Sequence, residues 1–127
     1  MAEAEPSPED FQLALNAMRD GVILWSPGGR VVVSNAAVSR LMDLPGNLVR
    51  RGARRTDVMV HLARRGDYGP TDDPEGLAAE LSGRFGSGAV ASLTRRLPDG
   101  RYLRADAKPV EGGRLVVTYR EVPPPAS

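Results

Sequence analysis

Hydrophobic side chains near the start of the chain recur with the period of an α-helix. They stand at i, i+3, i+4 and i+7: Phe11, Ala14, Leu15 and Met18. Ser7, followed by Pro8 and by Asp10, is typical of a helix start, because the serine hydroxyl and the acid can each accept a hydrogen bond from a first-turn N–H group. The pattern predicts an amphipathic helix over residues 7–19. Its apolar face needs a partner surface, either the chain's own sheet or another chain.

Two short runs of β-branched and aromatic residues follow this helix. Val22–Trp25 and Arg30–Ser34 flank a Ser-Pro-Gly-Gly sequence that favours a tight turn, so the segment predicts a β-hairpin. Asn35 is placed to cap a helix directly after the hairpin. Pro45-Gly46 is expected to stop that helix, whose inner face holds Val38, Leu41 and Met42.

Two further helices are expected in the middle of the chain. Thr56 can cap the first and Gly66 is placed to end it, with the inward residues Val58, Met59 and Leu62. Asp73 begins the second, whose apolar residues at helical spacing are Leu77, Ala78, Leu81 and Phe85. Gly76 and Gly83 weaken this second helix by roughly 1 kcal/mol each relative to alanine.

From Gly88 onward the hydrophobic period changes to two. Strands are predicted over Ala89–Leu97, Arg101–Lys108 and Leu115–Val122, joined by tight turns into an antiparallel meander. The order helix, two strands, short helices, three strands indicates an α+β fold, in which a five-stranded sheet holds the helices on one face. One domain is expected over residues 7–122, after a flexible lead at 1–6 and before a proline-rich tail or linker at 123–127.

Composition narrows the classes of function. The chain has no cysteine, which excludes disulfides, thiolate catalysis and cysteine-linked cofactors. No run approaches the roughly 18 apolar residues of a membrane helix and the acidic start is unlike a secretory signal, so a cytoplasmic protein without a membrane partner is expected. A net charge of +1 gives little reason to expect nucleic-acid binding. The arginine pairs can form a phosphate-binding patch or a solvated face, and the nearly equal number of acids favours the solvated face: Arg50-Arg51, Arg54-Arg55 and Arg64-Arg65.

Short motifs in a fixed order span nearly the whole chain: Leu15–Gly21, Gly28–Asn35, Leu44-Pro45, Arg64–Gly69, Arg95–Arg101, Pro109 and Thr118-Tyr119. With the element order above, this set resembles the PAS domain, and specifically the branch found ahead of bacterial sensor histidine kinases and diguanylate cyclases. The resemblance implies an antiparallel sheet of strand order 2-1-5-4-3 and a cavity between sheet and helices. It also implies dimerisation through the N-terminal helix and the outer sheet face, and coupling to an effector through the last strand. The family's helix after that strand is not matched, because Pro123 and two further prolines follow Val122.

The inward positions and the resemblance together give candidate binding residues. The expected ligand cavity is lined by Trp25, Met42, Met59, Tyr68, Phe85 and Leu103, and the alternative is that these side chains fill it completely. The expected dimerisation residues are Phe11, Leu15 and Met18. Asp67 and Tyr68 can line a cavity mouth, or they can belong to a capped helix end in which Tyr68 plugs the core. The single histidine, His61, is expected to be a surface or half-buried residue, so no metal, haem or other cofactor is expected.

No catalytic residue is identified, because the pattern offers neither a nucleophile with a nearby histidine nor a glycine-rich phosphate loop. We therefore expect a sensory and dimerisation module of bacterial signal transduction and not an enzyme. Its place would be the input domain of a sensor histidine kinase or related regulator, as a homodimer that meets an effector or partner protein, with a small-molecule ligand as an option. The alternative is a standalone scaffold that binds a partner protein without sensing a ligand. An enzyme would need catalytic groups around Asp67, Tyr68 and Arg104.

Overall fold

The structure, a computed structural model, describes residues 5–87 and 91–125. Its strands are β1 (Gly21–Trp25), β2 (Val31–Ser34), β3 (Ser92–Arg96), β4 (Tyr102–Val110) and β5 (Arg114–Val122). Its helices are α1 (Pro8–Asn16), α2 (Ala36–Met42), α3 (Arg55–Arg65) and α4 (Pro74–Ser87), with short 3-10 turns η1 (Gly46–Leu48) and η2 (Glu111–Gly113). Three predicted features extend outside the described residues: the first four residues of the lead, the start of the third strand at 89–90, and the last two residues of the tail.

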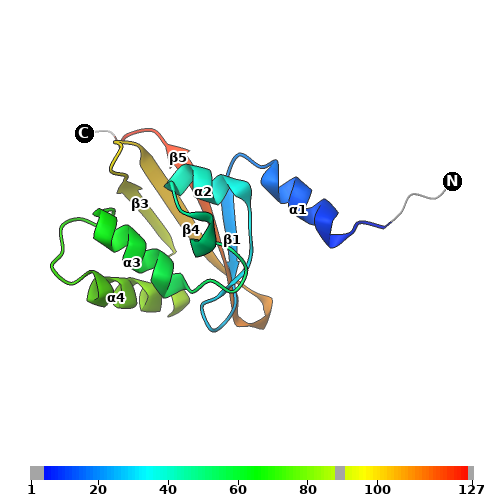
Figure 1. Cartoon of the computed structure of the whole chain (residues 1–127), viewed down its shortest axis with the longest axis horizontal. Helices are drawn as coiled ribbons and strands as arrows, with labels where there is room; N and C mark the ends of the chain where they lie inside the picture. The colour runs from blue at the N-terminus through cyan, green and yellow to red at the C-terminus, as the bar shows by residue number, and fades with distance from the viewer. Residues whose placement is uncertain (1–4, 88–90, 126–127) are drawn as a thin grey trace.

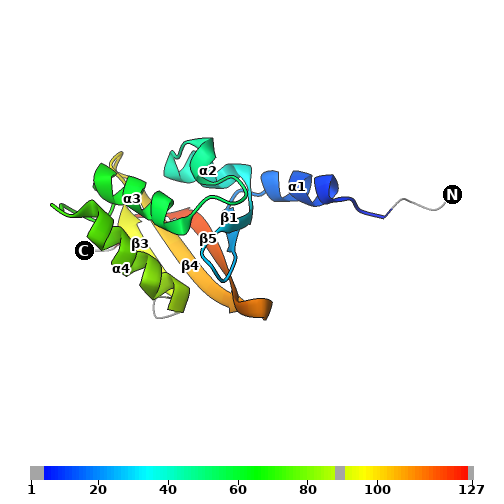
Figure 2. The ribbon, with the colours of Figure 1, turned by 60° about the horizontal axis from the view of Figure 1, so that its bottom comes forward.

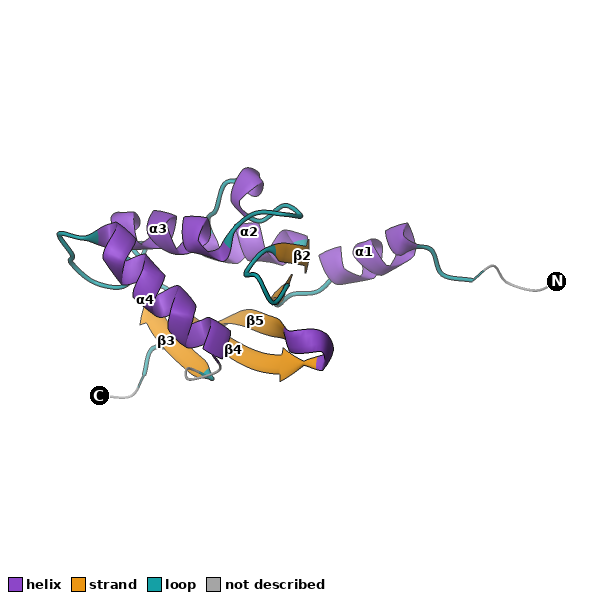
Figure 3. Cartoon of the chain, turned by 90° about the horizontal axis from the view of Figure 1, so that it is seen from below, coloured by secondary structure: helices purple, strands orange, loops and turns teal. Residues whose placement is uncertain are grey.

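The five strands form one antiparallel sheet in the order β2-β1-β5-β4-β3, which confirms the predicted α+β fold and strand order. Helices α2, α3 and α4 lie on one face of this sheet, as Figures 1 and 3 show. The core lies between the two layers, where alternate residues of β1, such as Ile23 and Trp25, are buried. Helix α1 projects away from the domain, and its last turn lies near the start of α2 (Figure 2).

The start of α1 forms as predicted. The Ser7 side chain accepts from the Asp10 N–H and the Asp10 carboxylate accepts from the Ser7 N–H, which is a complete capping box. The helix ends at Asn16, earlier than the predicted residue 19. In a longer helix the Leu15 carbonyl would accept from the Arg19 N–H, but it accepts from the Met18 N–H at 3.2 Å and from the Asn35 side chain at 2.7 Å.

Asn35 stands at the N-cap position of α2, but its side chain does not cap that helix. Its Nδ2 donates to the carbonyls of Leu15 at 2.7 Å and Asp20 at 2.9 Å, and its Oδ1 accepts from the Val22 N–H at 3.0 Å. The predicted capping role is therefore wrong. The buried amide instead ties the end of α1 to the start of β1.

Helix α2 ends at Met42, ahead of the predicted Pro45-Gly46 stop, because Asp43 adopts a left-handed conformation with φ of 51°. Helix α3 begins at Arg55 with Arg54 as its N-cap residue, so the predicted cap at Thr56 is also wrong. Up to Arg55 the chain is held beside the β1–β2 turn by two contacts. One is a β-bridge between Arg30 and Arg54, and the other is the hydrogen bond that the Arg55 N–H donates to the Gly29 carbonyl. The helix can start only where that extended pairing ends.

Candidate functional site

Helix α1 places large apolar side chains in the open. None of its residues is buried, and Phe11 is 60% exposed, Leu13 68% and Met18, just beyond the helix, 41%. Leu15, the third residue of the predicted dimerisation stripe, is half-buried. The contacts that hold α1 to the domain include polar ones: Gln12 Nε2 donates to the Ser34 carbonyl at 2.8 Å, and Asn16 Oδ1 accepts from the Ala36 N–H at 3.0 Å.

A hollow separates α1 from the edge strand β2. We call it the α1 hollow, and its volume is about 620 Å³. Phe11 and Leu15 line one wall and Val32 and Val33 of β2 line the other, with Arg50 and Arg51 also contributing. The helix and the strand thus contribute mostly apolar side chains, with Gln12 and Ser34 as their polar members, and the arginines add positive charge beside them.

The six predicted cavity residues meet in one place. Five of them are buried and Tyr68 is half-buried, and all belong to the single hydrophobic cluster between sheet and helices: Trp25, Met42, Met59, Tyr68, Phe85 and Leu103. The Tyr68 hydroxyl donates to Met59 Sδ at 3.2 Å. Met42 also reaches a small surface pocket of about 90 Å³ beside Arg101. Their role in lining a ligand cavity stays a prediction.

An ionic network is built into the same interior. The Asp67 carboxylate is fully buried and accepts two hydrogen bonds from Arg65, from Nε and Nη2, both at 2.8 Å. Arg95 of β3 approaches the same carboxylate with Nε at 3.4 Å and contacts Met42 Sδ with Nη2 at 3.3 Å. The Arg95 Cζ atom lies 5.3 Å from the centre of the Tyr68 ring. The carboxylate therefore neutralises charge inside the protein and is not exposed at a cavity mouth.

The pKa values of two side chains in this region are raised, for different reasons. The hydrogen bonds from Arg65 to Asp67 raise the pKa of the Arg65 guanidinium above its ordinary value. Burial raises the pKa of the Tyr68 phenol, against the opposing effect of Arg95. Gly66 ends α3 in a left-handed conformation with φ of 93°. The Arg65–Gly69 stretch is thus a capped helix end packed around a buried ion pair.

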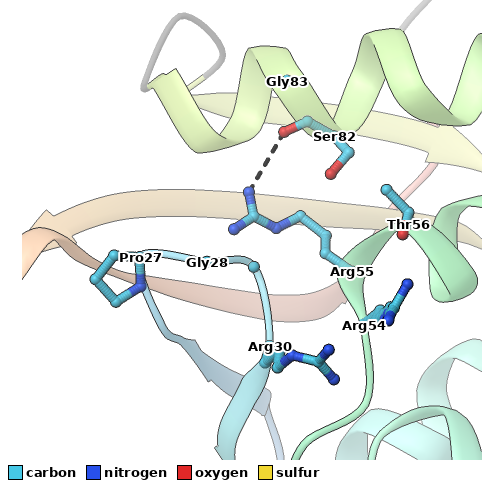
Figure 4. Close-up of a pocket in the computed structure, with 9 residues that line it drawn as sticks. Pro27, Gly28, Arg30, Arg54, Arg55, Thr56, Ser82 and Gly83 are labelled. Atoms are coloured by element: carbon cyan, nitrogen blue, oxygen red, sulfur yellow. Dashed lines mark hydrogen bonds between the residues drawn. The ribbon is translucent and has the colours of Figure 1, made fainter.

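A second buried arginine opens onto a surface pocket, which we call the Arg55 pocket. Arg55 extends from the first turn of α3 toward α4, where its Nη1 donates to the Ser82 carbonyl at 3.3 Å (Figure 4). The pocket has a volume of about 360 Å³. Its lining comes from the β1–β2 turn, the start of α3 and the middle of α4: Pro27, Gly28, Gly29, Arg30, Arg54, Arg55, Thr56, Ser82 and Gly83.

Arg55 is 6% exposed, so the expectation of a solvated face fails for this member of the arginine pairs. Its guanidinium stacks on Trp25, with Cζ 5.2 Å from the ring centre. Burial lowers the pKa of Arg55 below its ordinary value, with an opposing contribution from Tyr119. Its Nε is buried and has no hydrogen-bond partner among the described residues.

In the described part of the chain, no three His, Cys, Asp or Glu side chains gather as they would around a metal ion. His61 is half-buried on α3. None of the helices in residues 5–87 and 91–125 is long and apolar enough to cross a membrane.

The sequence matches the family model described as PAS fold over residues 15–125. The chain belongs to the PAS-fold family. This match covers the sheet and the helices that pack on it, and it confirms the resemblance carried by the ordered motifs. PAS domains are typically sensory modules and not catalytic ones. A comparison with curated proteins gives no match.

Solved PAS domains share this fold at low sequence identity. The PAS domain of BvgS from Bordetella pertussis is 15% identical with a TM-score of 0.56, over 91% of this chain and 86% of that one. The Photoactive Yellow Protein domain of the sensor histidine kinase Ppr from Rhodospirillum centenum is 19% identical with a TM-score of 0.51, over 86% and 91%. The PAS domain of the quorum-sensing receptor RpfR from Cronobacter turicensis, in complex with C12:0, is 13% identical with a TM-score of 0.51, over 84% and 96%. These likenesses show the fold.

Sequence reasoning missed three residues of this PAS domain. Leu13 escaped because it lies outside the i, i+3, i+4 spacing of Phe11 and Leu15. Arg95 alternates with Leu93 and Leu97, and this period of two was a usable signal that its side chain points inward. Arg55 gave no local signal, because its burial depends on the β1–β2 turn and on α4, both remote in sequence.

Proposed function

We propose that this PAS domain is a sensory and dimerisation module of bacterial signal transduction, which acts in the cytoplasm as the input domain of a sensor histidine kinase or a related regulator. The observation that carries the proposal is helix α1, which leaves Phe11 and Leu13 more than half exposed. A surface of this kind marks an interaction site when it is contiguous.

Helix α1 needs a partner for its own stability. It has nine residues, and isolated helices shorter than about 12–15 residues are marginal in water. With no buried residue, α1 gains little from apolar packing on its own domain. Covering Phe11 and Leu13 with another protein surface would supply that stabilisation.

A second copy of the chain is the occupant that fits best. Glu9, in the first turn of α1, is exposed, and Arg50 and Arg51 lie beside the α1 hollow. In a two-fold dimer the same patch serves both partners, so each α1 can place apolar residues in the partner's hollow and an acidic first turn near the partner's arginines. The net charge of +1 opposes self-association only weakly.

Asn35 supports a route by which the interior can influence α1. Its side chain joins the end of α1 to Asp20 and Val22 at the start of β1, and β1 pairs along its length with β5. A small molecule lodged among the six predicted cavity residues would displace β1 residues such as Trp25. The strand would transmit that displacement to α1 through Asn35 and to an effector through the end of β5. The complex of the RpfR PAS domain with C12:0 supports a small-molecule ligand as an option for this fold.

The test is the oligomeric state measured by sedimentation velocity over a range of protein concentrations. We expect a dimer for the wild type and a monomer for the double variant Phe11→Asp/Leu13→Asp, because two carboxylates would be buried in the interface. Ala79→Asp is the control, since Ala79 is an exposed apolar residue of α4, on the helix side of the domain and away from both α1 and the outer sheet face. The dimer proposal would be overturned if the wild type stayed monomeric at high concentration. It would also be overturned if the control variant dissociated as much as the double variant.

The alternative of a standalone scaffold has one observation in its favour. Strand β5 ends at Val122, and the next residues are exposed prolines, which cannot continue directly as a helix. Rigid helical coupling from β5 is therefore disfavoured. Native mass spectrometry of the protein purified from its own cells separates the two roles: a mass excess lost on denaturation supports a ligand sensor, and a bare dimer mass supports a scaffold.

A further inference from the structure

Two arginines in this domain present the same edge of the guanidinium to very different surroundings. Arg65 directs its Nε and Nη2 atoms at the two oxygens of Asp67, the bidentate geometry that suits a carboxylate. Arg55 uses Nη1 for the Ser82 carbonyl. Its Nε and Nη2 atoms, the edge that Arg65 gives to Asp67, make no hydrogen bond within residues 5–87 and 91–125.

Arg55 is therefore a buried cation without a carboxylate. Only 6% of its surface is exposed, and no acidic side chain of the described residues forms an ion pair with it. The contrast with Arg95 is direct, since Arg95 is equally buried and reaches Asp67. Buried charges in proteins are normally paired, so the Arg55 guanidinium lacks its expected counter-ion.

The surroundings of Arg55 select for negative charge. Three arginines and no acid are among the described residues that line the pocket. Gly28 and Gly29 leave the floor beside the guanidinium free of side chains, and a Cβ atom at Gly29 would lie 3.5 Å from Arg55 Nη2. The volume of about 360 Å³ falls within the range of small-molecule sites, about 300–1,000 Å³. The pocket thus has room for more than an inorganic ion.

We infer that the Arg55 pocket binds a small metabolite through an oxyanion, a carboxylate or a phosphate group, seated on the unpaired edge of Arg55. Arg30 and Arg54 add attraction from the rim, and Thr56 and Ser82 offer polar groups for the rest of the ligand. The site differs from the predicted cavity, because none of the six cavity residues is among the described residues that line the pocket, although Trp25 stacks on Arg55.

Occupancy of this pocket would tie three elements together. Arg55 already contacts Trp25 of β1, the Ser82 carbonyl of α4 and the turn at Gly29. An oxyanion bonded to the free edge of Arg55 would hold the β1–β2 turn, the start of α3 and α4 in one arrangement. The inference does not depend on the dimer, since no residue of α1 lines the pocket.

The test uses the full chain and its single tryptophan, Trp25, as the reporter. Its fluorescence is titrated with inorganic phosphate, glycerol 3-phosphate, succinate and citrate, at an ionic strength kept constant with sodium chloride. We expect a saturable change with at least one of these anions. Saturation by the phosphates alone identifies a phosphate site, by the carboxylates alone a carboxylate site, and by both a general oxyanion site.

Three variants assign the binding to the pocket, by isothermal titration calorimetry. Arg55→Met keeps the aliphatic contact with Trp25 and removes the donors, and we expect the affinity to fall about tenfold or more. Gly83→Leu adds a side chain at the pocket wall while Arg55 itself is kept, at a position where a Cβ atom meets open space, and should weaken binding as well. Arg40→Met removes an exposed arginine on α2 and should leave the affinity unchanged. The inference is overturned if none of the four anions saturates, if chloride gives the same response, or if Arg40→Met weakens binding as much as Arg55→Met.

Discussion

The guanidinium carbon of Arg55 lies 5.2 Å from the centre of the Trp25 ring, so a buried cation rests on the indole of the chain's only tryptophan. The ring quadrupole attracts the cation, and such contacts contribute about 0.5–2 kcal/mol. This is less than the several kcal/mol that desolvation of an ion costs. In the absence of a ligand, the native state with Arg55 is thus less stable than the native state would be with an apolar side chain at this position.

Arg55→Met is expected to leave the free energy of unfolding unchanged or to raise it. A methionine keeps the packing on Trp25 and removes the uncompensated charge, and replacement of buried ionic groups by apolar ones of similar size is often neutral or stabilising. The measurement is urea denaturation followed by circular dichroism, because the substitution changes the tryptophan signal itself. Arg55→Ala, which also removes the stacked aliphatic stem, should be less stable than Arg55→Met. A large loss of stability in Arg55→Met would show that the guanidinium is already compensated.

Asp67→Asn should destabilise the domain strongly. The carboxylate is fully buried between Arg65 and Arg95, and its loss leaves the Arg95 charge in the interior without an anion. Breaking a buried ion pair in this way costs about 3–5 kcal/mol. Urea denaturation followed by Trp25 fluorescence measures the change.

The control for Asp67→Asn is Glu80→Gln, which breaks an exposed i, i+4 pair with Arg84 on α4. Pairs of that kind contribute about 0.3–0.5 kcal/mol. Equal effects of the two substitutions would contradict the structural role of the Asp67 network.

Most of the fold was predictable from local patterns. The run of β-branched and aromatic residues in β1 and the Ser-Pro-Gly-Gly turn predicted the hairpin, and the capping box at Ser7 predicted the start of α1. The errors lie where distant segments decide the outcome. Thr56 has the chemistry of a cap, but α3 begins one residue before it, because pairing with the β1–β2 turn fixes the chain up to Arg54.

The Arg55 pocket was beyond local reasoning for the same physical reason. An arginine pair in a sequence with balanced charge favours a solvated surface, and nothing near Arg55 distinguishes it from Arg54. The burial of Arg55 requires three elements to converge, and only one of them contains Arg55 itself. The predicted cavity residues, in contrast, followed from apolar positions assigned within single segments and from the resemblance to the PAS domain. Their gathering in one core was therefore predictable, and their role in lining a ligand cavity stays a prediction.

Asn35→Ala should loosen α1 specifically. It leaves the Leu15 and Asp20 carbonyls and the Val22 N–H without the partner they now share. Each unsatisfied buried polar group costs about 1–3 kcal/mol. We expect faster hydrogen exchange at the amides of α1 and the start of β1, with α3 unchanged. Asn47→Ala, at an exposed asparagine, is the control. If the amides of α1 exchanged at the wild-type rate in Asn35→Ala, Asn35 would not be what holds α1 to β1.

Gly76 and Gly83 of α4 should respond to alanine with opposite signs. At Gly83 a Cβ atom meets open space, so Gly83→Ala should stabilise the domain by up to about 1 kcal/mol through helix propensity. At Gly76 a Cβ atom would collide with the Asp73 carboxylate, which accepts a hydrogen bond from the Gly76 N–H at 3.1 Å. Gly76→Ala therefore displaces the cap and should lose stability, although the sequence alone predicts the same gain at both positions. Equal shifts in the denaturation midpoints of the two variants would contradict this account.

Tyr119 should make the domain sensitive to alkaline pH. Burial raises the pKa of its phenol well above the ordinary value of 10.0, and the neighbouring Tyr68 acts in the same direction. Above pH 10 the unfolded chain releases this proton while the native state retains it, so the unfolded state binds fewer protons and stability falls as pH rises. The contribution is fully present below pH 10 and is lost progressively as pH approaches the raised native pKa.

Tyr119→Phe removes this ionisation and should flatten the fall in the free energy of unfolding above pH 10, as measured by urea denaturation at several pH values. Tyr102→Phe, which removes a phenol from a half-buried position on β4, provides the matched comparison. The slope for Tyr119→Phe should be shallower than the slope for Tyr102→Phe, because Tyr119→Phe removes a phenol whose native pKa is raised by burial. Parallel slopes in the wild type and Tyr119→Phe would mean that the phenol ionises as readily in the folded protein as in the unfolded chain, and that water reaches it in the native state.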